Sequence, residues 1–363
     1  MKFLTLEKDV FGLDISDRSL KLVSLKKKKN SFVLDSFNHM EIEPGIIEEG
    51  VIKNEDALAK IIRALCKNTK GKRIKTKYVA VSLPEEKSFL QVIQMPKMEA
   101  ADLVSAVPYE AENYIPLPMS EVYLDFQRII PTKDHLDHLD VLIVATPKKI
   151  VNSYVSCLKK AGLIPVIFEV ESQAIARALI KNDVSERPIA LLDFGKTSTD
   201  FIVFAGRSIQ FTCSLPISSQ QLTQALATAL QIDLDKAEKI KVKCDVSNPK
   251  KDQKSGKILE ALNPIFEELT QQIKKYINFY QDHASHEHLS SNYKIEKLLL
   301  CGGGVNLKGF PKLLSEKLGI SAELGDFWTN LSSKKPTDAM YKDSLSFTTA
   351  LGLALRGMNN TDD

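Results

Sequence analysis

The amino-acid sequence predicts an α/β fold in which two related domains enclose a cleft. Three turns rich in glycine or aspartate support this, each after an apolar strand-like run: FGLDISDRSLKLV, ALLDFGKTSTDFIVF and KLLLCGGGVNLKGF. The first two share the pattern strand–Asp–turn–strand, and the third is a strand, a glycine turn and a helix. Two β-turns that can grip phosphates and a metal, with a glycine-rich helix start, suit a nucleotide held between domains.

The bulk composition is that of an ordinary globular protein. The chain has 363 residues, of which 44% are hydrophobic and 26% charged, and this length accommodates two domains of typical size. Its 49 basic and 46 acidic residues nearly balance, which argues against a nucleic-acid partner. The one dense basic cluster, Lys26–Lys29, fits a solvated hairpin better than a phosphate-binding or membrane-binding patch.

The cysteines and the hydropathy pattern predict a soluble, cytoplasmic protein. The five cysteines are scattered without a CxxC pair, as expected for reduced thiols rather than for disulfides or a zinc site. No apolar run reaches the roughly 18 residues of a membrane-spanning helix. We therefore expect no direct membrane insertion, and any membrane link must come through a partner.

Residues 1–84 are expected to form the core of the first domain. Strands at 10–15 and 20–25 flank a tight turn, and a third strand follows at 31–37. The helical spacing of apolar residues predicts a helix over DALAKIIRALCKNT, and KYVAVSLP returns to a strand.

Residues 85–165 have the pattern of a unit inserted into that domain. FLQVIQMP predicts a strand, MEAADLVSAVPYEAENYI a helix that contains Pro108, and VYLDFQRIIP and DVLIVATP two paired strands. KKIVNSYVSCLKKAGL is an amphipathic helix that ends at Gly162. The unit thus has the order strand–helix–strand–strand–helix.

The second half begins like the first. Residues 166–188 are expected to return to the first domain and run into an interdomain helix. Residues 189–342 form the second domain, which opens with LDFGKTSTDFIVF, a repeat in pattern of LDISDRSLKLVSL. Residues 343–363 contain SFTTALGLALR, which predicts a closing interdomain helix followed by a tail.

Together these segments resemble the PilM family of type IV pilus assembly proteins, which belongs to the actin-like ATPase superfamily and is itself similar to FtsA. The resemblance covers nearly the whole chain. Besides the three turns it is carried by EPGIIEEGVIKNEDALAKIIRAL, by LPISSQQLTQALATAL with LDKAEKIK, and most specifically by YEAENYIPLPMSEVYLDFQ. It implies an actin-like ATPase fold, with two domains around an ATP cleft and an FtsA/PilM-type subdomain inserted in the first.

The resemblance also implies a function. The protein would be a cytoplasmic ATP-binding scaffold of a type IV pilus or competence machine, serving twitching motility, with ATP and Mg²⁺ as cofactors. Its partner would be the cytoplasmic N-terminal peptide of a PilN-like bitopic membrane protein. That partner would recruit the protein to the inner face of the cytoplasmic membrane, and other pilus assembly components are further candidate partners.

The first two turns supply the candidate phosphate and metal residues. Two aspartates that face one another across a cleft suit Mg²⁺ held through water, whereas a single aspartate at a strand end is commonly a turn cap. The candidate nucleotide-binding residues in the two phosphate turns are Asp14, Ser16, Ser19 and Lys21, and Asp193, Gly195, Lys196, Thr197 and Ser198. Asp17, Arg18 and Lys196 depart from the family's small residues, which leaves the nucleotide affinity open.

The third turn and one glutamate complete the expected site. The turn Gly302, Gly303, Gly304 and Val305 is expected to take the adenosine, because a Cβ at the central positions would collide with a nucleotide. Glu171 matches the family's glutamate that orients the attacking water; alternatively it is an acid favoured by a helix dipole, and Glu169 is a competing candidate. The sequence leaves open whether ATP is hydrolysed at a useful rate.

A separate partner surface is expected in the inserted unit. Aromatic and apolar residues gather there where a helix meets a proline-stiffened loop, namely Tyr109, Tyr114, Ile115, Pro116 and Leu117. The resemblance indicates a shallow groove for an extended peptide at this point. Tyr114 and Ile115 would serve equally well to close the subdomain's own core.

Two other functions remain open at this stage. One is an FtsA-like filament-forming division protein, which the sequence disfavours because FtsA carries a C-terminal amphipathic membrane helix and this chain stops after its closing helix. The other is a small-metabolite kinase on the same core, for which no second-substrate motif is recognised. The P-loop pattern GxxxxGK[ST] is absent. Whether the chain polymerises or dimerises, and which pilus-like system it serves, is not determined.

Overall fold

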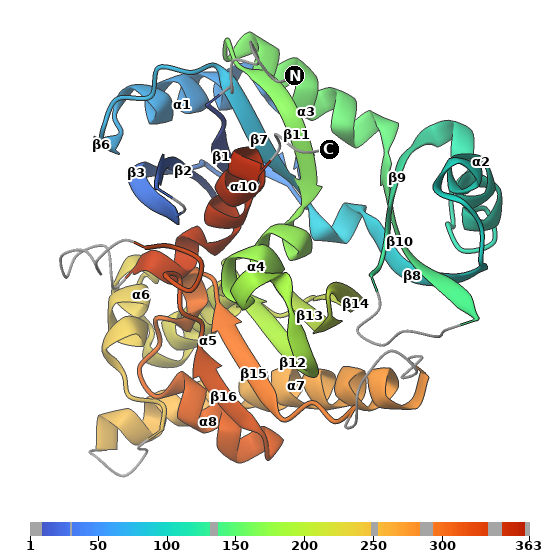
Figure 1. Ribbon diagram of the computed structural model, residues 1–363. Helices are drawn as coiled ribbons and strands as arrows, with labels where there is room; N and C mark the ends of the chain where they lie inside the picture. Colours follow the sequence, from blue (N-terminus) through green and yellow to red (C-terminus); the bar gives the residue numbers. More distant parts are fainter. Residues whose placement is uncertain are drawn as a thin grey trace.

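A computed structural model of the chain contains two α/β domains, one above the other in Figure 1, and a smaller unit to one side of them. The structure describes residues 9–29, 31–130, 137–247, 253–283, 293–332 and 343–359. Each of the two domains is built on its own sheet, and the smaller unit has a third.

Domain 1 is built on a six-stranded sheet with the order β11-β7-β1-β2-β3-β6. Its central strand β1 is almost wholly buried and reads FGLDIS, with Asp14 and Ser16 as its polar residues. The strands are β1 (Phe11–Ser16), β2 (Ser19–Lys28), β3 (Ser31–Glu41), β6 (Lys70–Gly71), β7 (Tyr78–Leu83) and β11 (Ile164–Val170), with a small hairpin of β4 (Ile47–Glu48) and β5 (Val51–Ile52). Helix α1 (Glu55–Lys67) begins at Asn54, whose side chain accepts a hydrogen bond from the backbone N–H of Ala57.

Domain 2 is built on a five-stranded sheet with the order β14-β13-β12-β15-β16. Its strands are β12 (Ser185–Phe194), β13 (Thr199–Gly206), β14 (Ser208–Leu215), β15 (Lys297–Cys301) and β16 (Ser321–Leu324). Its helices are α5 (Ser219–Leu230), α6 (Leu234–Lys243), α7 (Gln253–His283) and α8 (Phe310–Leu318). A capping box between Ser218 and Gln221 starts α5, and this start lies next to the second predicted phosphate turn.

The two domains share one topology. In domain 1, β1 pairs antiparallel with β2 and parallel with β7; in domain 2, β12 pairs antiparallel with β13 and parallel with β15. The order β3-β2-β1-β7-β11 therefore repeats as β14-β13-β12-β15-β16. The prediction of two related domains is confirmed.

The smaller unit is a three-stranded sheet with one helix. The sheet order is β8-β10-β9, from β8 (Phe89–Pro96), β9 (Val122–Arg128) and β10 (His138–Pro147), and the helix is α2 (Ala100–Ala111). Short 3₁₀ turns, η1 (Glu85–Lys87) and η2 (Met119–Glu121), precede β8 and β9. Helix α2 continues through Pro108, and its buried residues Leu103 and Val107 close the unit's core.

The last helix of the predicted inserted unit belongs elsewhere. Helix α3 (Lys148–Lys160) buries Tyr154, Cys157 and Leu158 in the core of domain 1, not against the three-stranded sheet. The hydroxyl of Tyr154 donates to the backbone carbonyl of Gly50, 3.1 Å away. The separately packed unit therefore ends near Pro147, earlier than the predicted boundary at residue 165.

Two helices cross between the domains at the centre of the molecule (Figure 1). They are α4 (Glu171–Leu179) and α10 (Thr348–Asn359), and α10 is buried along almost its whole length. A Cβ on Gly352 would lie 1.8 Å from the carbonyl oxygen of Ala174, so the close crossing of the two helices requires glycine at this position. Short turns border the crossing: η3 (Lys181–Asp183) follows α4, and η5 (Ser344–Phe347) leads into α10.

Helix α7 has 31 residues, and one of its faces, with Leu262, Phe266 and Ile273, is buried in the core of domain 2. Its remaining faces are polar enough that α7 does not qualify as a membrane span. In the described part of the chain, no helix combines the length and apolar character needed to cross a bilayer.

The five cysteines are free, and three of them, Cys157, Cys244 and Cys301, are buried. Burial raises the pKa of the Cys66 thiol to about 11 and that of Cys213 to about 12. Burial also raises the pKa of Cys157 to about 12. No disulfide joins any of the five cysteines in this structure.

Candidate functional site

A cavity of about 460 Å³ lies between the two domains, and both domains contribute to its walls. It brings together residues that the sequence separates by nearly 300 positions. The predicted site residues that line it are Asp14, Ser16, Ser19, Lys21, Glu171, Asp193, Gly195, Lys196, Thr197, Ser198, Gly302, Gly303 and Gly304.

The turn between β1 and β2 forms one wall. Asp14 and Lys21 are directly opposite one another on the two strands, and Lys21 Nζ donates to Asp14 Oδ2 at 3.1 Å. The other carboxylate oxygen of Asp14 accepts a hydrogen bond from Ser82 Oγ at 3.2 Å. Ser16 and Ser19 are joined through their hydroxyl groups, 3.1 Å apart. This wall is thus held in shape by its own hydrogen bonds.

Asp17, the unusual acid in this turn, faces away from the cavity. Its carboxylate accepts hydrogen bonds from the backbone N–H groups of Glu49 and Gly50, at 2.8 and 2.9 Å. Asp17 therefore holds the neighbouring turn and does not oppose an anion in the cavity. Arg18, the next residue, does line the cavity.

The turn between β12 and β13 forms the opposite wall. The Gly195 N–H donates to the Ser198 carbonyl at 3.0 Å and closes the turn. The carbonyls of Gly195 and Lys196 accept from the N–H groups of Ser219 and Gln220, at 3.0 and 3.1 Å, which fixes the turn to the start of α5. The turn is thus closed on itself and anchored to domain 2 through α5.

Acidic side chains outnumber buried cations around the cavity. Burial raises the pKa of Asp193 to about 6; Lys21 opposes this shift and Asp14 adds to it. Burial and the nearby Asp200 and Asp14 raise the pKa of Glu171 well above its ordinary value. For Lys21, burial lowers the pKa, but Asp14, Asp193 and Glu171 raise it to a net increase.

This excess of carboxylates is what a divalent cation would offset. Among the described residues, no cluster of three or more His, Cys, Asp or Glu side chains is arranged to hold a metal directly. Asp14 and Asp193 both line the cavity, one from each domain.

The three glycines at the end of β15 have different reasons to be glycine. A Cβ on Gly302, whose φ is +91°, would lie 2.1 Å from Asp193 Oδ1, and a Cβ on Gly304 would lie 2.7 Å from the Phe194 ring. Both positions are restricted by the protein itself. Only Gly303 opens freely onto the cavity, because its nearest neighbour would be Ser346 Cβ at 4.0 Å.

Val305 corrects one site prediction. Its side chain is 2% exposed and lies in the core of domain 2, outside the residues that line the cavity. The 3₁₀ turn η4 (Gly303–Val305) turns this side chain inward, a change of direction that a run of glycines does not reveal.

The two candidate glutamates, Glu171 and Glu169, lie in different surroundings. Glu171 lines the cavity, and its Oε2 accepts a hydrogen bond from the backbone N–H of Glu85 at 3.1 Å. Glu169 is buried and bound by both terminal nitrogens of Arg177, with Nη2 2.6 Å from Glu169 Oε1. Glu169 is thus engaged in an ion pair, and Glu171 is the glutamate available to the cavity.

Sequence reasoning missed several residues that line the cavity. Asp200 lies opposite Asp193 across the β12–β13 pair, a cross-strand relation that two acids seven residues apart in a hairpin could have indicated. Glu238 on α6 accepts from Thr223 Oγ1 at 2.5 Å and pairs with Lys241 at 2.8 Å. The other missed lining residues are Glu41, Ser219, Gln220, Thr223, Leu234, Asp235, Leu345, Ser346 and Thr349.

Comparison with known proteins identifies the family. The family model described as "Type IV pilus assembly protein PilM" matches residues 12–358. The chain belongs to this family. Among solved structures, it is similar to the protein in a "PilM-PilN type IV pilus biogenesis complex", with 29% identity and a TM-score of 0.79, over 97% of this chain and 99% of that one. The sequence-based resemblance is confirmed.

Other relatives place the PilM family within the actin-like ATPase fold. MreB5 of Spiroplasma citri bound to ADP matches with 11% identity and a TM-score of 0.56, over 98% of this chain and 99% of that one. The ethanolamine utilization protein EutJ from Carboxydothermus hydrogenoformans matches with 17% identity and a TM-score of 0.55, over 95% and 88%. These two show the fold alone.

Curated relatives include the cell division protein FtsA. The FtsA of Pseudomonas aeruginosa is 24% identical over 225 residues, which are 57% of this chain and 51% of that protein. The match therefore spans only about half the length of that relative. It supports the actin-like superfamily and does not extend to the function of the whole FtsA protein.

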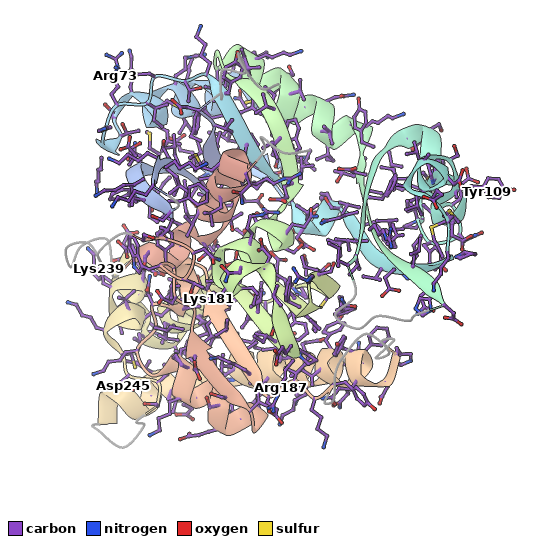
Figure 2. All side chains as sticks on the ribbon, in the orientation of Figure 1. Arg73, Tyr109, Lys181, Arg187, Lys239 and Asp245 are labelled. Atoms are coloured by element: carbon purple, nitrogen blue, oxygen red, sulfur yellow. The ribbon has the colours of Figure 1, made fainter. Side chains whose placement is uncertain are left out.

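The residues predicted to bind a partner peptide lie on the inserted unit, and all of them except Ile115 are exposed. Tyr109 is 80% exposed and points outward at the edge of the molecule in Figure 2. Tyr114 and Leu117 are 37% and 40% exposed. Ile115 is 6% exposed and packs in the unit's core. This residue therefore closes the subdomain's own core, which the sequence had left open as the alternative.

Proposed function

We propose that the protein is an ATP-binding scaffold of a type IV pilus assembly machine, in which the nucleotide state is coupled to binding of a PilN-like membrane protein. The observation that carries the nucleotide part is the interdomain cavity. Three turns, predicted independently from the sequence, converge there, with all their predicted residues except Val305 on its walls. Membership of the PilM family supports the pilus part.

The residues present fit Mg²⁺ and ATP. The turns 16–19 and 195–198 offer backbone N–H groups and hydroxyls suited to the β- and γ-phosphates, and Lys21, Arg18 and Lys196 add positive charge. Asp14 and Asp193 would hold Mg²⁺ through water, and the adenosine would lie against Gly303. Bound Mg²⁺ would supply charge compensation for the phosphates and for the surrounding carboxylates.

Turnover is expected to be slow. In phosphoryl transfer the protein mainly positions the attacking water, and Glu171 is the candidate for that role. Burial and nearby carboxylates raise the pKa of Glu171, which favours the protonated form, a poor hydrogen-bond acceptor for water. We expect phosphate release far below the roughly 10 s⁻¹ that is typical of enzymes.

The proposed partner is the cytoplasmic N-terminal peptide of a PilN-like bitopic membrane protein. Similarity to the protein of the PilM-PilN complex along 97% of the chain supports it. Such a partner would bring the protein to the inner face of the cytoplasmic membrane, where a pilus machine for twitching motility or competence assembles. Tyr109, Tyr114 and Leu117 supply exposed anchors for an extended peptide.

Gly303 gives the sharpest test of the nucleotide site. Because the space beside Gly303 contains no protein atom closer than 4.0 Å, Gly303→Ala and Gly303→Val should fold normally and fill the cavity in two steps. Titration with a fluorescent ATP analogue and Mg²⁺ should show saturable binding by the wild type. Affinity should fall about tenfold or more in Gly303→Val, with Gly303→Ala in between, since each step displaces ligand contact.

The unfolding temperature of each variant provides the control. Equal affinity in all three proteins, at unchanged unfolding temperature, would remove the adenosine assignment. Absence of any binding by the wild type would remove the nucleotide function itself.

A further inference from the structure

Helix α4, which begins at the candidate catalytic Glu171, has no capping side chain of its own. Its N-cap residue is Val170, which cannot accept a hydrogen bond through its side chain. The cap comes instead from Glu85, whose Oε2 accepts from the Ser172 N–H at 3.0 Å. A residue 87 positions away thus satisfies one of the free N–H groups at the start of this helix.

The contact runs in both directions. The backbone N–H of Glu85 donates to Glu171 Oε2 at 3.1 Å, while the carboxylate of Glu85 receives the Ser172 N–H. Glu171 and Ser172 at the start of α4 are therefore both hydrogen-bonded to Glu85 in turn η1. This double link fixes both the start of α4 and the direction of the Glu171 side chain, which lines the cavity.

Glu85 lies at the junction with the inserted unit. It opens turn η1 directly after β7 and Pro84, and β8 of the inserted sheet begins at Phe89. Ser88 Oγ donates to the Pro84 carbonyl at 3.0 Å and lies 2.9 Å from Thr146 Oγ1, near the end of β10. The outgoing and returning connections of the inserted unit are thus tied together beside Glu85.

Two further contacts converge on the same junction. Thr212 on β14 of domain 2 lies close enough to the Glu85 carboxylate to lower its pKa, against the larger increase that burial causes. Gly50, whose N–H is held by Asp17 of the first phosphate turn, packs closely on Pro84; a Cβ there would lie 2.6 Å from the proline Cβ. The junction therefore contacts both domains, the inserted unit and one wall of the cavity.

We propose that Glu85 is a positioning residue that aims Glu171 at the nucleotide cavity and makes its position depend on the inserted unit. A change in the inserted unit would move the 84–88 segment and with it the N–H that holds Glu171. Occupancy of the cavity that draws Glu171 inward would pull on the same segment. The inference rests on the proposed nucleotide function for its consequence, but the link itself is present without a ligand.

Hydrogen exchange of single backbone amides tests the link in the nucleotide-free full chain. In Glu171→Ala the Glu85 N–H loses its acceptor, so its exchange should accelerate about tenfold or more. In Glu85→Ala the Ser172 N–H should accelerate similarly, and Glu85→Gln, which keeps an acceptor oxygen, should restore protection. Glu86→Gln, on the same turn, is the matched control and should leave both amides unchanged. Unchanged exchange of the Glu85 amide in Glu171→Ala would overturn the proposal.

Addition of Mg·ATP separates this inference from the proposed function. Binding should slow amide exchange in the turn 195–198 and also change exchange at Glu85, and the second effect alone should disappear in Glu171→Ala. Slowing at 195–198 without any change at Glu85 in the wild type would refute the link and leave nucleotide binding intact. No slowing anywhere would refute nucleotide binding, while the ligand-free exchange still decides the link.

A kinetic split distinguishes positioning from a merely structural role. Glu85→Ala should lower the rate of phosphate release about tenfold while ATP affinity stays within about threefold of wild type. Glu85→Gln should recover most of that rate. Equal losses of affinity and rate in both variants would assign Glu85 to general stability of the cleft.

Discussion

At the residue scale, Asp193 shows how a ligand site is kept at a cost to the fold. Its carboxylate lies near Asp14 beside the buried strand ends, and burial raises its pKa to about 6 from an ordinary value of 3.8. A proton is then bound more tightly in the folded state than in the unfolded one. Ionisation therefore destabilises the fold, and the penalty grows as pH rises from about 3.8 to about 6 and is complete above that.

We predict that Asp193→Asn is more stable than wild type at neutral pH and binds Mg·ATP poorly. The gain in unfolding free energy should be about 1–2 kcal/mol above pH 6.5, because the amide removes a partly buried charge without removing volume. This gain in unfolding free energy should shrink as pH falls toward 4, where the Asp193 side chain of the folded wild type is protonated. Denaturant unfolding at a series of pH values measures it; a pH-independent difference would show that the charge is not the cause.

Single residues also mark the limit of sequence reasoning at the site. Sequence patterns could predict that Asp14, Ser16, Lys21 and Gly303 line the cavity, because each belongs to a turn whose shape depends on residues adjacent in the sequence. Glu238 could not, since its position depends on how α6 packs against α5. Val305 was misassigned because the direction of a side chain after a 3₁₀ turn is set by the domain core, not by the glycines before it.

At the scale of elements, α2 and the loop after it form the surface proposed for a membrane-protein tail. The exposed Tyr109 and Leu117 are candidate anchors, whereas Ile115 is needed inside the unit. A deletion of residues 85–160 would also remove α3 and expose the core of domain 1. Point variants of the intact chain are therefore the appropriate test.

We predict that Tyr109→Ala with Leu117→Ala weakens binding of the cytoplasmic N-terminal peptide of a PilN-like protein by about tenfold or more, the typical effect of removing anchors that a partner buries. Isothermal calorimetry on the intact chain measures it. Val104→Ala, another exposed apolar position on α2, is the control and should bind normally. If the double variant retains full affinity while the wild type binds, the peptide groove lies on another surface.

The boundaries of elements show why sequence patterns could place the inserted unit but not delimit it. The sequence pattern changes near residue 85 because short strands begin there. Strands β8, β9 and β10 lie where the sequence predicts strands. Helix α3 is amphipathic whichever neighbour it covers, so its sequence does not say that its apolar face meets α1 and β5 of domain 1. Only the long-range packing of Tyr154 and Leu158 decides it.

At the scale of the whole molecule, the cavity is a shared property of two halves with one topology. Each half supplies an aspartate and a turn, and α4 and α10 cross between them at Gly352. Helix α10 also packs closely on strand β1 at Gly12, where a Cβ would lie 2.1 Å from the Ala350 carbonyl oxygen. The halves should therefore respond to a ligand together.

We predict a single cooperative thermal transition that Mg·ATP shifts upward as a whole. A ligand at 100 times its dissociation constant adds about 2.7 kcal/mol to the unfolding free energy if it binds only the folded state. Scanning calorimetry with and without Mg·ATP measures the shift, with Mg²⁺ alone as the control. Two separate transitions, of which only one moves, would mean that the nucleotide contacts one domain alone.

The raised pKa values of the cysteines have a practical consequence for such measurements. A thiol reacts through its thiolate, and raised pKa values leave Cys66, Cys157 and Cys213 almost wholly protonated at neutral pH. A new cysteine at an exposed position outside the proposed anchors, such as Val104→Cys, would be far more reactive than these. A fluorescent dye can thus be attached at a chosen position without first replacing the protein's own cysteines. Binding of a membrane-protein tail can then be followed in real time on a protein that is otherwise unchanged.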